Sequence, residues 1–165
     1  MGGRNALPMR ELIELFVALG YANVQTYIQS GNIVFDSPKR VGKKKAELES
    51  QRISETRGFT PRILILGEDD LHSAIENNPF SGSDGKTLHF FFLESTPRQP
   101  KLDRLAGLKA ESEEFVLIES VFYLLAPNGI GRSRLAPAVE SALGIPATAR
   151  NWNTVAKLAS MVERE

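Results

Sequence analysis

Two short polar segments in the second half of this sequence have side chains suited to binding an anion. The first is Arg132-Ser133-Arg134, which follows a glycine-containing turn, and the second is Arg150-Asn151-Trp152-Asn153-Thr154. Guanidinium groups form charge-assisted hydrogen bonds with phosphates and carboxylates, and the free backbone N–H groups at a helix start favour the same anions. If the two segments lie close together, their arginines form a compact positive patch.

Both segments also have a simpler structural interpretation. Asn151 is a favourable N-cap for a helix that starts at the next residue, with Trp152 buried and Arg150 bonded to nearby carbonyls. We favour this interpretation for the second segment, and we expect Ser133 to cap a helix in the first. The candidate ligand site comprises Arg132, Ser133, Arg134, Arg150, Asn151, Trp152, Asn153 and Thr154.

The glycine-rich run Asn128-Gly129-Ile130-Gly131-Arg132-Ser133 does not predict a nucleotide cofactor. It lacks the third glycine of the dinucleotide fingerprint and the lysine of a P-loop, and it follows a predicted hairpin strand. We interpret it as a turn in which a glycine has a positive φ angle.

A secondary candidate site lies in the first half, at Tyr27, Gln29, Ser30 and Asn32. These side chains either hold a tight turn through bonds to the backbone or form a strand surface that reads single-stranded RNA. The aromatic signature of RNA-recognition sheets is absent, because Phe90, Phe91 and Phe92 are consecutive. We therefore predict that these three rings lie in the core.

Composition excludes several classes of site. The chain has no cysteine and two histidines, which excludes disulfides and thiolate chemistry, and we predict neither a metal site nor a cofactor. His89 is expected to be a satisfied core histidine. The 20 basic and 20 acidic residues balance, so no overall field attracts nucleic acid. Residues 127–157 are a local exception, with four basic residues and one acidic residue, Glu140.

Hydrophobic periodicity predicts the order of the elements. In the first half we expect a helix, two strands, a charged helix and a strand, at residues 8–19, 24–29, 33–35, 44–56 and 62–66. The charged helix has a short apolar face of Ala46, Leu48 and Ile53. A short helix starts at residue 68, and residues 88–93 are almost uniformly apolar, which is typical of a central strand buried on both faces. The remaining elements are a helix at 102–108, strands at 115–118 and 121–125, a helix at 135–143, an extended segment at 146–149 and a helix at 152–163.

This order predicts an α+β fold of two tandem ferredoxin-like (split βαβ) plaits with a final helix. The first plait lacks its N-terminal central strand. Residues 81–86 are polar and contain glycine, so we place a domain boundary there, with one half at 1–80 and the other at 81–165.

Several motifs resemble those of a bacterial family, the domain of unknown function number 1697. They are Gly2-Gly3-Arg4-Asn5, residues 26–35, Tyr123-Leu124, residues 127–133, Thr148 and residues 150–158. The resemblance implies a plait-based α+β fold and a soluble bacterial protein, and it implies no activity.

Similar family members start about a dozen residues earlier, with an apolar strand before the glycine pair. Met1 stands where that strand would end, so we expect a misplaced start codon or a truncated chain. The alternatives are that the fourth strand closes the gap or that a partner chain supplies a strand.

Three classes of function follow from these observations. The first is a non-catalytic module that binds an anionic ligand or nucleic acid. The second is a small enzyme acting on a phosphorylated or acidic metabolite, although no nucleophile–base pair is identifiable. The third is an interaction module that forms a homodimer. We predict a cytoplasmic location without membrane contact, since the sequence has no membrane-length apolar run and no signal peptide.

Overall fold

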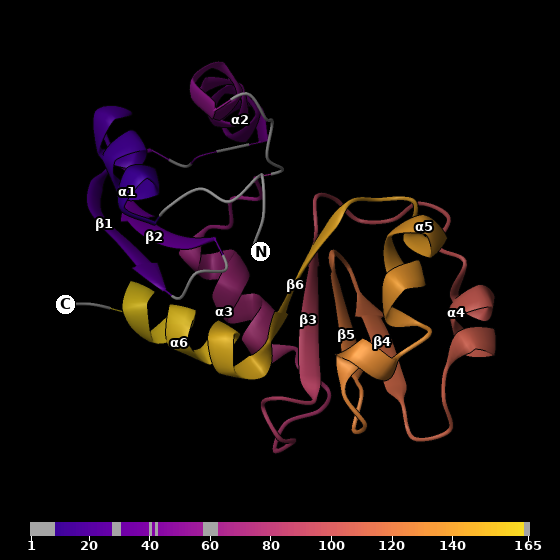
Figure 1. The fold of residues 1–165 in the computed structure, drawn as a ribbon. Helices are drawn as coiled ribbons and strands as arrows, with labels where there is room; N and C mark the ends of the chain where they lie inside the picture. The colour runs from indigo at the N-terminus through magenta and orange to yellow at the C-terminus, as the bar shows by residue number, and fades with distance from the viewer. Residues whose placement is uncertain (1–8, 28–30, 40, 42, 58–62, 164–165) are drawn as a thin grey trace. The chain divides into compact units, whose positions relative to one another are not determined.

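The computed structural model describes residues 9–27, 31–39, 41, 43–57 and 63–163 of the chain. These residues form a mixed α/β fold with two sheets (Figure 1). The chain divides into two compact units, the first comprising residues 1–68 and 160–165 and the second residues 69–159. None of the described helices is long and apolar enough to cross a membrane.

Among its described residues, the first unit contains two complete helices and a β-hairpin, together with the last residues of α6 (Trp152–Val162). Its elements are α1 (Met9–Ala18), β1 (Ala22–Tyr27), β2 (Asn32–Asp36) and α2 (Lys43–Arg57). Strands β1 and β2 pair in the antiparallel sense, with Thr26 opposite Ile33. Gly20 has a φ angle of +93°, which suits a glycine after the last turn of a helix. The predicted helix, hairpin and charged helix are therefore confirmed.

Two predictions for the first unit are wrong. Residues 63–66 are not in a strand, and Arg62 lies outside the described residues. Helix α2 buries Ala46 and Ile53 as expected, but Leu48 is exposed and the neighbouring Glu49 is buried instead. A short apolar run without periodicity does not show whether the segment is a strand or irregular. In a helix with few apolar residues, the sequence does not determine which side faces the core, so other contacts determine it.

The buried face of α2 contains a polar contact. The Tyr21 hydroxyl donates a hydrogen bond to Glu49 Oε1, and Glu49 is fully buried. Burial, followed by this bond, raises the pKa of the Tyr21 hydroxyl well above its ordinary value. Tyr21 also packs against Phe16 and Phe35, so the contact lies at the edge of an aromatic cluster in the first unit.

The second unit contains a four-stranded antiparallel sheet. Its elements are α3 (Glu68–Glu76), β3 (Leu88–Leu93), α4 (Leu102–Leu108), β4 (Glu114–Ile118), β5 (Val121–Leu125), the 3₁₀ turns η2 (Ile130–Arg132) and η3 (Ala136–Ala138), α5 (Val139–Leu143), β6 (Ala147–Asn151) and α6 (Trp152–Val162). The strand order is β4-β5-β3-β6. Strand β3 is central and all its residues are buried, as the sequence predicted.

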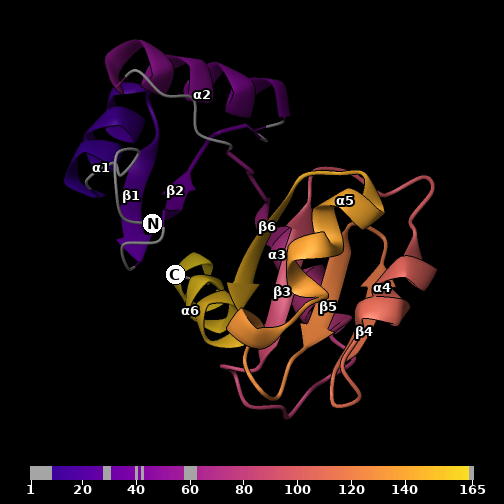
Figure 2. The same cartoon turned by 45° about the vertical axis from the view of Figure 1, so that its right-hand side comes forward.

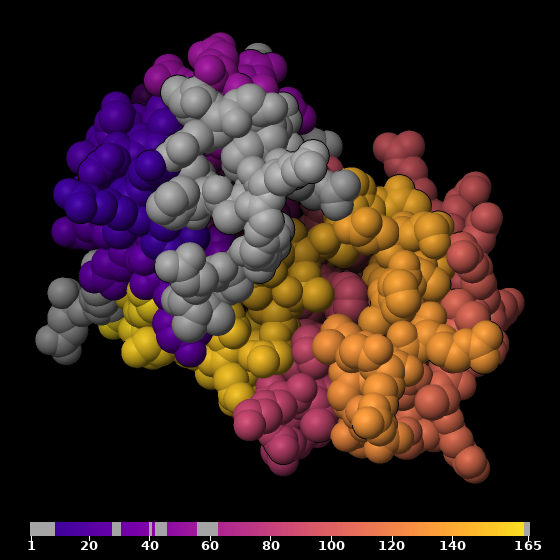
Figure 3. All heavy atoms as spheres, in the orientation of Figure 1, coloured from indigo at the N-terminus to yellow at the C-terminus, as the bar shows by residue number. Residues whose placement is uncertain are grey.

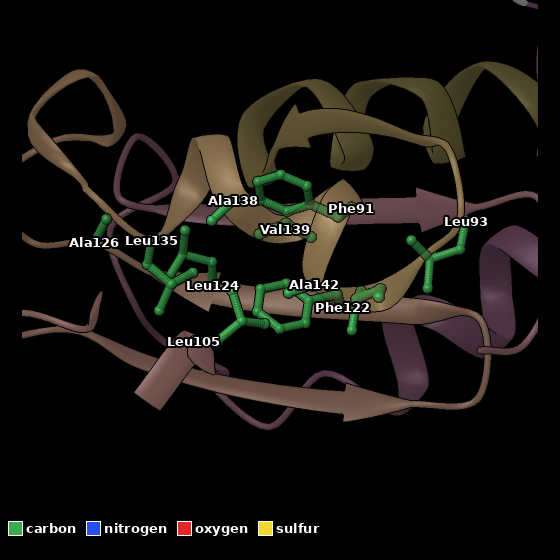
Figure 4. Packing of buried hydrophobic residues seen from close by; sticks show 11 residues of the cluster. Phe91, Leu93, Leu105, Phe122, Leu124, Ala126, Leu135, Ala138, Val139 and Ala142 are labelled. Carbon is green, nitrogen blue, oxygen red and sulfur yellow. The ribbon is translucent and has the colours of Figure 1, made fainter. Parts of the chain in front are cut away.

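The two faces of this sheet bury different sets of side chains. Phe91, Phe122 and Leu124 pack with residues of α4 and α5 in one hydrophobic cluster (Figure 4). Tyr123 lies on the opposite face, where its ring contacts Phe90 edge-on and its hydroxyl donates to the Ala74 carbonyl of α3 at 2.6 Å. Figure 2 shows α4 and α5 on one side of the sheet and α3 on the other. The consecutive phenylalanines are therefore core residues.

The helix predicted at residues 135–143 is shorter than expected. Residues 136–138 form the 3₁₀ turn η3, and the α-helix starts at Val139. Pro137 lacks a backbone donor, which suits this first turn. Two other predictions are untested: that the first plait lacks its N-terminal central strand, and that a domain boundary lies at residues 81–86. Residues 1–8 lie outside the described residues.

Two leucines on α4 test the packing of the second unit. Leu105 is 0% exposed in the hydrophobic cluster, whereas Leu102 is 36% exposed. We expect Leu105→Ala to lower the free energy of unfolding by about 2–5 kcal/mol, because it leaves a cavity. Leu102→Ala on the same helix should cost less than about 1 kcal/mol. Urea unfolding followed by Trp152 fluorescence measures both, and equal losses would contradict this packing.

Candidate anion-binding site

The first candidate segment comes after β5, and the second contains the last two residues of β6 and the start of α6. Leu88, the first residue of β3, pairs with Leu125, the last of β5, and His89 pairs with Asn151, the last of β6. The antiparallel order therefore brings three segments to one end of the second unit's sheet: the loop before β3, the segment after β5 and the start of α6 (Figure 3). We call it the β3-start end of the sheet.

The segment after β5 is held in shape by local contacts. Gly129 has a φ angle of +95°, as predicted for this turn, and its N–H donates to the Ala126 carbonyl at 2.9 Å. The Ala136 N–H donates to Ser133 Oγ at 3.1 Å, but η3 starts at Ala136 and Leu135 holds its N-cap position, so Ser133 does not cap a helix as predicted. Asn128 Nδ2 donates to Ser112 Oγ at 3.2 Å, which ties the segment to the turn before β4.

Arg132 and Arg134 flank Ser133 and both are exposed. Neither guanidinium group has an ion-pair or hydrogen-bond partner among the residues that the structure describes. An exposed guanidinium that is not neutralised locally keeps its five donors for a ligand. The backbone between them is held in a local turn by the Arg132 N–H, which donates to the Gly129 carbonyl, and by Ser133 Oγ, which accepts from the Ala136 N–H.

The start of α6 matches the structural interpretation of the second segment. The Thr154 N–H donates to Asn151 Oδ1 at 2.9 Å, so Asn151 is the N-cap of α6. Trp152 stacks on Phe90, with ring centroids 5.7 Å apart, and is half-buried. Thr154 is buried and Asn153 is exposed. The cap satisfies one of the backbone donors of the first turn.

Arg150 belongs to the face of the sheet that α3 covers. It pairs with Phe90, which pairs with Tyr123, so the three side chains lie in one row. Arg150 Nη1 donates to the Ala149 carbonyl at 2.8 Å, and burial lowers the pKa of its guanidinium. Leu135, next to Arg134, packs on the opposite face. The register therefore does not support a compact patch of three arginines, and a shared role for them stays a prediction.

Three further residues lie at the β3-start end, and the sequence analysis did not include them in the candidate site. Gly85 lies against α6, because a Cβ added there would be 2.0 Å from Asn153 Oδ1. Lys86 is exposed at the start of β3. His89 is 8% exposed, and its Nδ1 atom is buried without a hydrogen-bond partner. The prediction that His89 is a satisfied core histidine is therefore wrong for this nitrogen. The feature of the sequence that could have indicated it is a single polar residue in an otherwise apolar strand.

The secondary candidate site lies in the first unit and is described in part. Asn32 is buried, and its Nδ2 donates to the Tyr27 carbonyl at 3.3 Å, which fits the structural interpretation of the turn. Gln29 and Ser30 lie outside the described residues. Across the described part of the chain, no three His, Asp or Glu side chains are placed together to hold a metal ion.

Comparison with known proteins places the chain in a family. A family model described as "Protein of unknown function (DUF1697)" matches residues 1–123, so the chain belongs to this family and the resemblance is confirmed. The solved structure of the conserved bacterial protein SP0830 from Streptococcus pneumoniae has the same fold, with a TM-score of 0.69 and 20% sequence identity. That match covers 99% of this chain and 93% of the other. No curated protein matches the sequence.

The cap of α6 can be tested by substitution. We expect Asn151→Ala to lower the free energy of unfolding by about 0.5–2 kcal/mol, because the Thr154 N–H loses its acceptor. Asn151→Asp should cost much less, since the carboxylate accepts the same bond. Urea unfolding of the two variants measures the difference, and equal losses would show that the cap contributes nothing.

The stability of the second unit should depend on the protonation of His89. Burial lowers the pKa of its imidazole, and a hydrogen bond to the Thr87 backbone opposes this in part. As the pH falls below about 6.5, the ordinary pKa of histidine, His89 is therefore protonated in the unfolded chain at a higher pH than in the folded protein. We expect the free energy of unfolding to fall between about pH 7 and pH 5, by at most about 1.4 kcal/mol per pH unit from this one group.

His89→Leu is the matched variant for this pH dependence, since leucine cannot be protonated. Urea unfolding at a series of pH values should give a flatter profile for the variant than for the unchanged protein. Identical profiles would show that burial does not perturb this imidazole.

Proposed function

We propose that this DUF1697 protein is a non-catalytic binding module that takes an anionic ligand at the β3-start end of the second unit's sheet. The observation that carries the proposal is the pair Arg132 and Arg134, both exposed and both without partners among the described residues. Two guanidinium groups two residues apart supply the charge and the donors that phosphate or carboxylate requires.

Neighbouring groups add positive potential at this end. Lys86 is exposed in the loop that precedes β3. The first turn of α6 has the positive end of a helix dipole, and Arg150 adds charge from the other face. The full proposed site is Arg132, Ser133, Arg134, Arg150, Asn151, Trp152, Asn153 and Thr154. The ligand is a small anion or the phosphate backbone of a nucleic acid.

We infer in addition that the second unit is a split βαβ plait. The order strand, helix, strand, strand, helix, strand and the antiparallel sequence β4-β5-β3-β6 support this inference. Plaits have many unrelated functions, so the fold does not choose the ligand. The absence of cysteine suits a cytoplasmic location, which we also propose. A homodimer stays a prediction of the sequence.

The test is a titration of Trp152 fluorescence with inorganic phosphate and with short single-stranded RNA and DNA, each at low and high salt. Trp152 is the single tryptophan and lies in the first turn of α6, so binding nearby should change its emission. We expect saturable binding that weakens with salt. The double variant Arg132→Glu with Arg134→Glu should weaken it about tenfold or more, since two charge-assisted contacts are reversed.

Arg98→Glu is the control for net charge, because Arg98 is also exposed but lies in the loop after β3, at the other end of this strand. It should bind as the unchanged protein does. If nucleic acid is the ligand, the double variant should also reduce the slope of log K against log salt by about 2. A double variant that binds normally, or a flat response to every compound, would contradict the proposal.

A further inference from the structure

Strand β4 is an edge of the second unit's sheet, and its side chains do not block the pairing of a further strand (Figure 1). Among the described residues its one partner is β5, and the pairing runs without a bulge from Glu114 to Ile118. The residues after Glu114 are apolar and only partly buried: Phe115, Val116, Leu117 and Ile118. Proteins commonly protect an edge strand with lysine, proline, a bulge or an inward-pointing charge. None of these is present in β4, all of whose residues the structure describes.

The strand at the other edge of this sheet, β6, is different. It contains Thr148 and Arg150 among its five residues. A charged side chain within an edge strand opposes the docking of a further strand, because docking removes water from the charge. The charges of β4 lie beside its apolar run and not within it. Of the two edge strands, β4 is therefore the one that suits strand addition.

The backbone groups on the open edge of β4 belong to Phe115 and Leu117. The turn between β4 and β5 is Glu119–Ser120, and the φ angle of +52° at Glu119 is typical of a two-residue hairpin turn. Such a turn directs the backbone groups of Ile118, which precedes it, towards β5. Antiparallel pairing turns the backbone groups of every second residue to the partner strand, so those of Phe115 and Leu117 face outwards. No described loop, turn or cap forms a backbone hydrogen bond with them.

A strand added beside β4 would also meet apolar side chains on both faces of the sheet. Phe115 and Leu117 pack against the hydrophobic cluster that α4 and α5 cover, and Phe115 stacks on Phe122 with ring centroids 5.4 Å apart. Val116 pairs with Tyr123, so it belongs to the aromatic face. A docking strand with apolar side chains would therefore extend both packed faces.

The charge around this edge is acidic. Glu114 and Glu119 are exposed at the two ends of β4, and Glu111 is exposed in the turn before it. Residues 110–131 contain no basic residue. The basic residue directly before them, Lys109, donates from its Nζ atom to the carbonyl of the next residue at 3.3 Å. Both ends of β4 therefore favour positive charge on a partner.

The same carboxylates oppose a second copy of this chain as the partner. Two β4 strands paired in the antiparallel sense about Val116 would place their apolar residues opposite each other. They would also bring Glu114 of one copy within one residue of Glu119 of the other, at both ends of the pair. Like charges on neighbouring strands are destabilising. The partner that fits is an extended segment with apolar residues at its centre and lysine or arginine at its ends.

We propose that the open edge of β4 docks such a basic, extended segment of another protein, which becomes a fifth strand of this sheet. Main-chain hydrogen bonds to Phe115 and Leu117 supply affinity, and the carboxylates of Glu114 and Glu119 select the basic ends. This surface does not depend on the proposed anion site, and each can be correct without the other.

The first test uses a fluorescently labelled peptide in which alternating valine and threonine residues are flanked by two lysines at each end. We expect saturable binding, measured by anisotropy, that weakens with salt. The same core flanked by glutamates should bind about tenfold or more weakly, since its ends meet like charge. A lysine-flanked peptide with every core amide N-methylated should not bind, because it cannot pair with a strand. Equal binding of all three peptides, or of none, would overturn the proposal.

A charge-swapped variant tests which residues select the peptide. Glu114→Lys with Glu119→Lys changes two exposed side chains at the ends of β4. This double variant should prefer the glutamate-flanked peptide by about tenfold or more. Glu47→Lys with Glu55→Lys makes the same change in net charge at exposed positions of α2, in the first unit, and should keep the original preference. A β4 variant that still prefers the lysine-flanked peptide would contradict the assignment.

Hydrogen exchange of the unchanged protein shows where the peptide docks, without any variant. The N–H groups of Phe115 and Leu117 should become protected when the lysine-flanked peptide binds, whereas those of Val116 and Ile118 are protected already by β5. Protection that appears at β6 instead would overturn the proposal. Sedimentation of the free protein tests the other occupant. A dimer that protects Phe115 and Leu117 without peptide would show that a second copy occupies this edge, and the proposal would be wrong.

Discussion

Strand β3 is buried along its whole length between β5 and β6, and this burial constrains the rest of the second unit. A strand buried on both faces needs helices on both sides of the sheet. Helices α4 and α5 cover one face with leucine, valine and alanine side chains, and α3 covers the aromatic face, where Tyr123 bonds to the Ala74 carbonyl. The exception in this apolar strand is His89, whose Nδ1 atom is buried without a hydrogen-bond partner.

The antiparallel pairing of β3 also determines where a site can form. Because both neighbours of β3 end where β3 begins, the segment after β5 and the start of α6 meet at one end of the sheet. This end has exposed arginines, a capped helix start and a buried imidazole nitrogen without a hydrogen-bond partner. The same pairing places Arg150 in the row of Phe90 and Tyr123, on the aromatic face of the sheet.

The sequence predicts local features of this structure better than contacts between distant residues. The apolar run at 88–93, the cap at Asn151 and the positive φ angle at Gly129 each depend on neighbours in the chain, and all three are confirmed. The face on which Arg150 lies depends on the register with β3, which no local pattern reveals. The unpaired Nδ1 of His89 depends on what its neighbours across the sheet offer. Periodicity also failed at residues 63–66, where a short apolar run forms no strand.

The central claim is that the β3-start end of this sheet binds an anion. The most direct measurement is the mapping of amide chemical shifts during a titration with inorganic phosphate at low and at high salt. The account predicts that amides at residues 86–89, 128–135 and 151–154 shift together and saturate at low salt, and that they shift much less at high salt. Phosphate-induced shifts confined to other segments, such as residues 94–101 at the far end of β3, would contradict it.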